Sequence, residues 1–237
     1  MRATHKAETS KDRMQIKLER AHYQSARLIV AHSRAMQTEL IDDYGVAPAK
    51  IRVIYPPAAA QRFAPVSAAQ RSALRHKLGW PDDRIVFAFP SSSHERKGLP
   101  ALARFFESTD LPVMLAVVGR PLPRTWRNVQ YFGYHADIEQ IYQAADFTVL
   151  ASSYEPFGLV GIESVLCGTP VLLANGIGST EVLDDAAQIN FAADDAAGLA
   201  RAVATAVARV DQGTARLAEP PAISAMPPAP VRTRKHC

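Results

Sequence analysis

Short apolar runs alternate with longer amphipathic segments from about residue 85 to about residue 210. The runs are rich in Val, Ile, Leu and Phe and are bounded by polar turns, which predicts buried strands. They are Ile85–Phe89, Pro112–Val118, Val129–Phe132, Phe147–Leu150, Pro170–Ala174 and, as a short last strand, Gln188–Phe191. Helices are predicted between them at about 99–106, 137–144, 159–166 and 196–210. Strands that alternate with helices predict an α/β fold with a doubly wound parallel sheet.

The first part of the chain carries a smaller version of the same pattern. The predicted elements are a helix over Asp12–Ala26, a strand over Arg27–His32, a helix from the N-cap Ser33 to about Tyr44, and a strand over Ile51–Tyr55. Residues 61–81 are predicted to connect the two parts and to include a short helix. From residue 219 onward the chain holds five prolines and three basic residues, which predicts a disordered tail.

The strongest chemical signal is the stretch Ser153–Glu163, with the sequence Ser-Tyr-Glu-Pro-Phe-Gly-Leu-Val-Gly-Ile-Glu. It follows a predicted strand, turns at Pro156 and Gly158, and enters a predicted helix. The first N–H groups of a helix lack internal partners and its dipole favours negative charge, so this geometry binds anions. Gly158 allows a ligand to approach the backbone closely.

Two carboxylates lie on either side of this turn. Glu155 precedes it, and Glu163 lies about one helical turn inside the predicted helix. Carboxylates accept hydrogen bonds from hydroxyl groups. An anion site between two hydroxyl acceptors suits a nucleotide diphosphate sugar, which has ribose hydroxyls, a diphosphate and sugar hydroxyls. Ligands in such sheets bind at the carboxyl ends of the strands, where the loops after several predicted strands can converge.

Composition and charge limit the ligands, metal sites and cellular compartment that we expect for the protein. Of the 237 residues, 48% are hydrophobic, which is enough for a core, and the net charge is +4. This basic excess fits an anionic substrate or membrane surface, although ordinary solvated charge explains it more simply, and no nucleic-acid partner is expected. Cys167, Cys237 and the histidines show no disulfide or metal-ligand spacing, so no metal site is predicted. No apolar run is long enough to span a membrane and the start is no signal peptide, so we expect a cytoplasmic protein, with peripheral contact at the inner membrane face as an alternative.

The run Tyr131–Glu181 resembles the retaining glycosyltransferases of family 4, which have the GT-B fold. The match includes Glu-Pro-Phe-Gly-Leu-Val-x-x-Glu, Ile-Tyr-Gln-Ala-Ala-Asp before it, Cys-Gly-Thr-Pro-Val after it, and Gly-Ser-Thr-Glu at 178–181. The resemblance extends over roughly Lys17–Val210. It implies a Rossmann-like donor domain, which is the C-terminal half of a GT-B fold, plus an incomplete remnant of the N-terminal half.

The resemblance also implies roles for individual residues. Lys97 is expected to contact the donor diphosphate and Glu155 to accept hydroxyls of the donor sugar, as the catalytic pair. The donor-binding residues are expected to be Glu163 on the ribose, Phe157, Gly158 and Leu159 through backbone N–H groups, and Gly133 and Tyr134 at the base. Ser92 stands five residues before Lys97, where the family usually has arginine, which leaves one diphosphate contact in question. Glu181 is interpreted as a structural, loop-anchoring residue. Without the resemblance, the two glutamates are ordinary carboxylates near a helix start.

The predicted domains are residues 1–62, the remnant of the acceptor domain, 63–212, the nucleotide-sugar-binding domain, and 213–237, the disordered tail. A hexosyltransferase-type enzyme is expected that needs no cofactor besides the nucleotide sugar and acts on an acceptor such as a cell-surface polysaccharide or lipopolysaccharide. Because most acceptor-side groups are not in this chain, we expect a separately encoded N-terminal half or self-association. The alternative is a truncated, inactive remnant that binds nucleotide sugars or another protein. A dinucleotide oxidoreductase is disfavoured, because no Gly-x-Gly-x-x-Gly follows a predicted strand.

Overall fold

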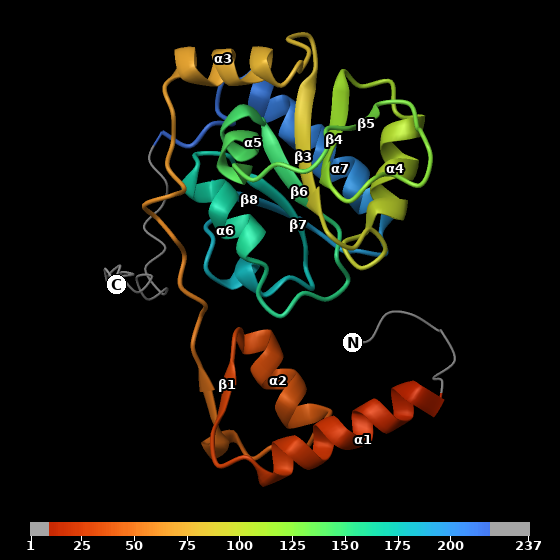
Figure 1. Cartoon of the computed structure of the whole chain (residues 1–237), viewed down its shortest axis with the longest axis vertical. Coiled ribbons are helices and arrows are strands. Elements are labelled where there is room, and N and C mark those ends of the chain that lie inside the picture. The colour runs from red at the N-terminus through yellow and green to blue at the C-terminus, as the bar shows by residue number, and fades with distance from the viewer. Residues whose placement is uncertain (1–9, 219–237) are drawn as a thin grey trace, which may run out of the picture.

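The computed structural model describes the backbone of residues 10–218, with side chains from residue 13, and its larger part is built on a six-stranded sheet. The strand order is β5-β4-β3-β6-β7-β8 (Figure 1). The strands are β3 (Ile85–Ser91), β4 (Val113–Gly119), β5 (Val129–Tyr131), β6 (Phe147–Leu150), β7 (Val171–Ala174) and β8 (Gln188–Phe191). Neighbouring strands pair in parallel, which confirms the predicted doubly wound α/β fold.

Helices cover both faces of this sheet (Figure 1). They are α3 (Ala68–Lys77), α4 (Leu99–Ser108), α5 (Ile138–Ala144), α6 (Leu159–Leu166) and α7 (Ala196–Asp211). Successive side chains of a strand point to opposite faces. Phe87 and Phe89 of β3 therefore join the core cluster that includes α4 and α7, whereas Val86 and Ala88 join the cluster that includes α3 and α5. β3 is buried along its whole length, which explains why its sequence is apolar without alternation.

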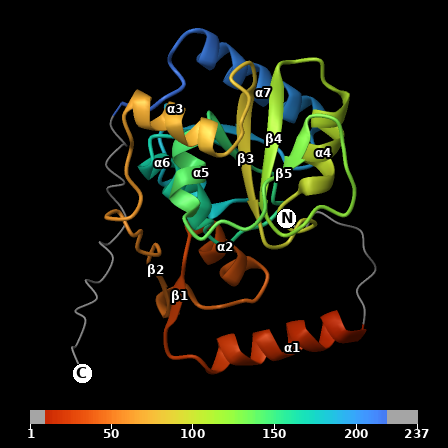
Figure 2. The same ribbon diagram turned by 45° about the horizontal axis from the view of Figure 1, so that its top comes forward.

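The smaller part lies at the carboxyl edge of this sheet, where its helix α2 contacts the loop after β7 (Figures 1 and 2). Its elements are α1 (Ser10–Ser25), β1 (Ile29–Ala31), α2 (Arg34–Asp42), the 3-10 turn η1 (Pro48–Lys50) and β2 (Ile51–Val53). β1 and β2 form a two-stranded parallel sheet with a small core of its own. Ser33 caps α2 as predicted, because its Oγ accepts a hydrogen bond from the backbone N–H of Met36.

The boundary predicted for the disordered tail, at residue 213, lies too early in the chain. Residues 213–218 pack against the larger part, where Ala215 is buried in the main core. Arg216 donates a hydrogen bond to the carbonyl oxygen of Cys167 at 3.1 Å, and burial lowers the pKa of this guanidinium to about 10. The error arose because an apolar residue and an anchored arginine hold this segment on the domain, which composition does not reveal. Residues 219–237, the remainder of the predicted tail, lie outside the described residues.

A carboxylate joins the two parts of the chain. Glu181, the last residue of the 3-10 turn η2 (Gly178–Glu181), accepts hydrogen bonds from the backbone N–H groups of Arg34 and Ala35, each at 2.8 Å. These are the first two residues of α2, whose N–H groups have no partner within the helix. A negative charge is also favoured at a helix N-terminus. The interpretation of Glu181 as an anchoring residue is therefore confirmed, and what it anchors is the smaller part of the chain.

Replacing Glu181 with Ala is expected to lower the free energy of unfolding by about 1 kcal/mol, the usual cost of losing a helix cap. Hydrogen exchange would locate the loss, because the amides of Arg34 and Ala35 should exchange faster while those of β3 should not. Replacing the exposed Glu95 with Ala is the matched control and should leave both regions unchanged. Equal acceleration throughout α2 and β3 in the Glu181 variant would contradict a local anchoring role.

Candidate functional site

Loops at the carboxyl ends of neighbouring strands contact one another. The carbonyl oxygen of Ser91, at the end of β3, accepts a hydrogen bond from the backbone N–H of Arg120 after β4, at 2.9 Å. The loop after β6 joins them through Ala151, whose N–H donates to the carbonyl oxygen of Lys97 at 3.2 Å. This is the edge at which open α/β sheets bind their ligands, and the predicted site residues lie along it.

Backbone hydrogen bonds hold the turn between β6 and α6 against the loop after β7. The N–H of Glu155 donates to the carbonyl oxygen of Gly176, and the carbonyl oxygen of Glu155 accepts from the N–H of Gly178, both at 3.0 Å. The N–H of Ser179 donates to the carbonyl oxygen of Phe157 at 2.7 Å, and the Phe157 ring is buried. The main chain of the turn is therefore held in place by the loop after β7.

Gly158 is the N-cap residue of α6 and has a φ of +87°, a conformation that side-chain-bearing residues adopt at a cost. A Cβ at this position would lie 2.8 Å from Cγ2 of Ile177, so the packing also requires glycine. No side chain caps α6 at this end. The N–H groups of Leu159 and Val160 have no acceptor within the helix, whereas that of Gly161 donates to the carbonyl oxygen of Gly158 at 3.1 Å.

Lys97 is buried, with 9% of its surface exposed, in the loop between β3 and α4. Its Nζ donates to the carbonyl oxygen of Pro90 at 3.2 Å, which uses one of the three donors of an ammonium group. Burial lowers the pKa of Lys97, because leaving water disfavours the charged form, while the charges of Glu155 and Glu163 raise it. The charges of both carboxylates thus act on the lysine, in the direction that favours its protonated form.

Glu155 is paired with a residue that the sequence analysis did not select. Nη1 of Arg96 lies 2.6 Å from Oε2 of Glu155, and the two side chains are 49% and 19% exposed. Arg96 belongs to the loop after β3 and Glu155 to the loop after β6, so the pair forms only because these strands are neighbours in the sheet. The sequence shows that Arg96 is charged and stands beside Lys97, but it does not identify Glu155 as the partner of Arg96.

Glu163 accepts a hydrogen bond at 3.1 Å from the hydroxyl of Tyr142, a fully buried residue of α5 that the sequence analysis also missed. Burial raises the pKa of Glu163, and the bond from Tyr142 acts in the opposite direction. The same burial and the adjacent carboxylate raise the pKa of Tyr142. One carboxylate oxygen is thus oriented by the protein, which leaves the other oxygen to accept from a ligand hydroxyl.

Gly133 and Tyr134 lie after β5, farther along the same edge. The carbonyl oxygen of Gly133 accepts a hydrogen bond from the N–H of Gly119 at 2.8 Å, and the φ of Gly133 is +81°. Tyr134 is 82% exposed. The structure therefore places Lys97 after β3, Glu155 after β6, Glu163 in α6, and Gly133 and Tyr134 after β5, along the same edge of the sheet.

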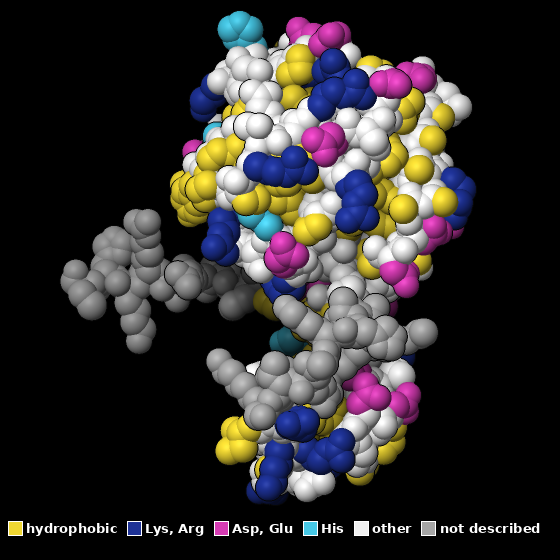
Figure 3. Space-filling model, turned by 90° about the vertical axis from the view of Figure 1, so that its right-hand side faces the viewer, with side chains coloured by type: hydrophobic (Ala, Val, Ile, Leu, Met, Phe, Trp, Pro, Cys, Tyr) yellow, Lys and Arg dark blue, Asp and Glu magenta, His cyan; other side chains and the backbone are white. Residues whose placement is uncertain are grey.

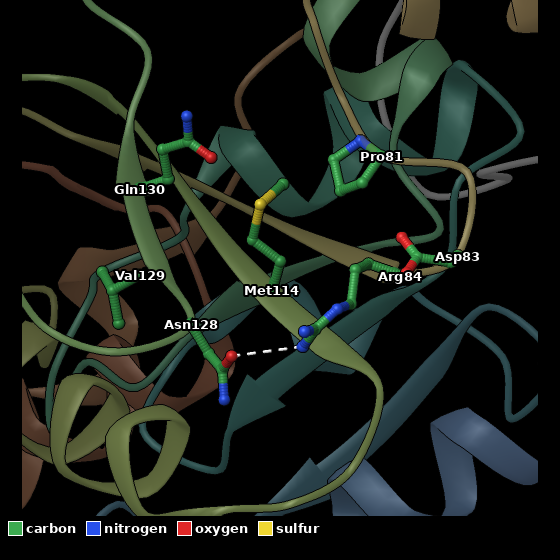
Figure 4. Close-up of a pocket in the computed structure, with 7 residues that line it drawn as sticks. All are labelled: Pro81, Asp83, Arg84, Met114, Asn128, Val129 and Gln130. Carbon is green, nitrogen blue, oxygen red and sulfur yellow. Dashed lines mark hydrogen bonds between the residues drawn. The ribbon is translucent and has the colours of Figure 1, made fainter.

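Two hollows lie at the opposite edge of the sheet. The one drawn in Figure 4 has a volume of about 480 Å³ and is lined by residues at the amino ends of β3, β4 and β5, where Arg84 donates to Asn128 at 3.2 Å. The other, of about 660 Å³, also borders the start of β3. Neither contains a residue of the predicted site.

Within residues 10–218, no cluster of His, Cys, Asp and Glu side chains has the arrangement of a metal site. In the same described part, none of the helices is long and apolar enough to cross a membrane. Figure 3 shows Lys and Arg side chains interspersed with Asp and Glu on one face of the larger part. On this face the positive charge does not form a single continuous patch.

Two family profiles match the sequence. The one described as glycosyl transferases group 1 matches residues 70–210, and the one described as glycosyltransferase family 4 matches residues 2–62. A protein of Burkholderia thailandensis named as a probable transglycosylase is 49% identical over 209 residues, which is 88% of this chain and 58% of the relative. Mannosylfructose-phosphate synthase of Agrobacterium fabrum is 32% identical over 175 residues, which is 64% of this chain and 38% of the relative. The matched part of the chain thus spans 58% of the first relative and 38% of the second, less than two thirds of either.

Solved structures agree with the fold. HepE of Anabaena, in a complex with UDP and glucose, superimposes with a TM-score of 0.74 at 25% identity and covers 87% of this chain and 60% of that protein. WaaG, a glycosyltransferase involved in lipopolysaccharide biosynthesis, superimposes with a TM-score of 0.76 at 21% identity, over 87% of this chain and 62% of that protein.

Proposed function

The chain belongs to the group 1 glycosyl transferases, and from this premise we propose that its larger part binds a nucleotide diphosphate sugar and supports transfer of the sugar with retention of configuration. The observation that carries the proposal is the uncapped N-terminus of α6, with Glu155 before it, Glu163 within it, and the buried Lys97 in the loop that is hydrogen-bonded to Ala151 at the end of β6. The helix N-terminus and the ammonium group attract a phosphate, and the flanking carboxylates accept hydrogen bonds from hydroxyl groups. The complex of HepE with UDP and glucose supports the same class of ligand.

Each predicted residue receives one role in this proposal. Lys97 and the N–H groups of Phe157, Gly158 and Leu159 bind the diphosphate. Glu163, oriented by Tyr142, accepts the ribose hydroxyls, and Glu155 accepts hydroxyls of the sugar. Gly133 and the exposed Tyr134 contact the base. The proposal includes no metal ion, because Lys97 and the N-terminus of α6 already offset part of the charge of the diphosphate.

The chemistry asked of these residues is electrostatic. When the bond between sugar and diphosphate breaks, negative charge grows on the leaving phosphate oxygen. Lys97 and the α6 N–H groups are already oriented, so they stabilise this charge without reorganisation. The burial that lowers the pKa of Lys97 also strengthens its field, because a less polar environment screens the charge less.

Calorimetry on the full chain tests the proposal. We expect UDP to bind without added metal, and a nucleotide sugar to bind at least as well. A folded sample that binds no nucleoside diphosphate would refute the proposed function. Binding without transfer of the sugar to any acceptor tried would favour the alternative, a chain that binds nucleotide sugars and does not catalyse.

Replacing Glu163 with Gln is expected to weaken UDP binding about tenfold, because the ribose hydroxyls lose a charged acceptor. Glutamine keeps the size and one acceptor oxygen, so the fold should persist. Isothermal titration of UDP and of uridine would both show the loss, because both carry the ribose. The control is Glu107, whose side chain is 42% exposed and lies 3.5 Å from Arg124; its replacement by Gln should leave both affinities unchanged. Unchanged UDP and uridine binding in the Glu163 variant would contradict the ribose role.

A further inference from the structure

Arg96 forms an ion pair with Glu155, the carboxylate that is proposed to bind the donor sugar. Its Nη1 lies 2.6 Å from Oε2 of Glu155, which is the residue proposed to accept the sugar hydroxyls. The ion pair has one fixed member, because the backbone of Glu155 is bonded to Gly176 and Gly178 and its side chain is 19% exposed. The guanidinium is the more exposed member, at 49%, on a longer and more flexible side chain.

The loop that carries Arg96 is itself held in place. The N–H of Lys97 donates to the carbonyl oxygen of Ser93 at 3.0 Å, and that of Gly98 donates to the carbonyl oxygen of Glu95 at 3.2 Å. Gly98 packs closely on the backbone of Ala151. A Cβ atom added at position 98 would lie 2.3 Å from the carbonyl oxygen of Ala151. If Arg96 changes its hydrogen-bonding partner, only its side chain has to rotate, and the backbone of the loop stays in place.

Charge balance explains why such a rotation is useful. A diphosphate carries at least two negative charges, and Lys97 supplies a single positive one. Glu155 adds a negative charge next to the same place, which opposes an incoming diphosphate unless it is neutralised. Arg96 is the adjacent cation, and its charge acts on Lys97 closely enough to contribute to lowering the pKa of that lysine.

We propose that Arg96 is a donor-binding residue that exchanges partners: it neutralises Glu155 in the free protein and moves to the diphosphate when the donor binds. The exchange replaces one charge-assisted hydrogen bond by another, and guanidinium groups bind phosphate oxygens well. Glu155 is then free to accept hydrogen bonds from the sugar hydroxyls, so the diphosphate of the donor releases the carboxylate that its own sugar needs. This inference rests on the proposed function.

The test compares ligands with and without the second phosphate. Arg96→Ala is expected to weaken UDP binding about tenfold and to change UMP binding less than twofold, as measured by calorimetry without added metal. Glu155→Gln is expected to tighten UDP binding about threefold, because the guanidinium is released, and to weaken binding of UDP-glucose. Arg104→Ala, on the exposed face of α4, is the control for loss of a remote positive charge.

The outcomes separate this inference from the function on which it rests. If the unmodified chain binds no UDP, the proposed function fails and the partner exchange fails with it. If the unmodified chain binds UDP and Arg96→Ala weakens UDP and UMP equally, or weakens neither, only the exchange is overturned. Weaker UDP binding in the Glu155→Gln variant would also overturn it, because Glu155 is proposed to compete with the diphosphate for Arg96. Melting temperatures of the variants show that each remains folded, and Arg96→Lys, which keeps the charge, should recover part of the UDP affinity.

Discussion

Replacing Gly98 with Ala is expected to lower the free energy of unfolding by about 2–5 kcal/mol, the largest effect on stability that we expect from a single methyl group in this chain. Two costs add at this position. The φ of Gly98 is +81°, which costs a residue with a Cβ about 1–2 kcal/mol. The new Cβ would also lie 2.3 Å from the carbonyl oxygen of Ala151, a backbone atom at the end of β6 that has little room to yield.

Gly79 separates the two costs. Its φ is +66°, but a Cβ there would meet no atom within 4 Å. Gly79→Ala is therefore expected to cost about 1–2 kcal/mol, the backbone share alone. Chemical denaturation of both variants measures the difference. Equal destabilisation would mean that the contact with Ala151 contributes nothing, and that the loop carrying Lys97 is not fixed by this packing.

Replacing Lys97 with Met is expected to weaken UDP binding about 100-fold, the loss of a charged hydrogen bond in a partly desolvated site. The same change should raise the stability of the free protein, because methionine fills the volume without a buried charge. Calorimetry measures the first effect and chemical denaturation the second. A loss of both affinity and stability would indicate that Lys97 is a structural residue.

The pH dependence of stability gives an independent check on Lys97. Burial lowers its pKa from the ordinary value of 10.5, so the folded chain holds fewer protons than the unfolded chain between the lowered pKa and 10.5. Stability should therefore rise with pH across that window, and the charged lysine should cost stability below it. Lys97→Met should remove this rise. The exposed Lys77, replaced by Met, is the control and should alter neither UDP affinity nor the slope.

The sequence alone determined the order and type of the main helices and strands and the strand–turn–helix arrangement after β6. These features depend on local physics. A run such as Phe147–Leu150 must be buried wherever it lies, and the strand proved to have those bounds. Ser33 is an N-cap because its oxygen reaches the third N–H beyond it, whatever surrounds the helix. Gly158 proved to have positive φ at the start of α6, where the sequence had placed it.

Only the tertiary structure decided which side chains meet. Arg96 pairs with Glu155, and Tyr142 with Glu163, because crossover connections bring loops and helices together that lie far apart along the chain. Lys97 was predicted as a site residue, but its burial depends on the packing of its loop against the end of β6. Periodicity and composition describe each residue with its neighbours in sequence. The partners of a charged group, and hence its pKa and its role, depend on distances through space that only the folded sheet sets.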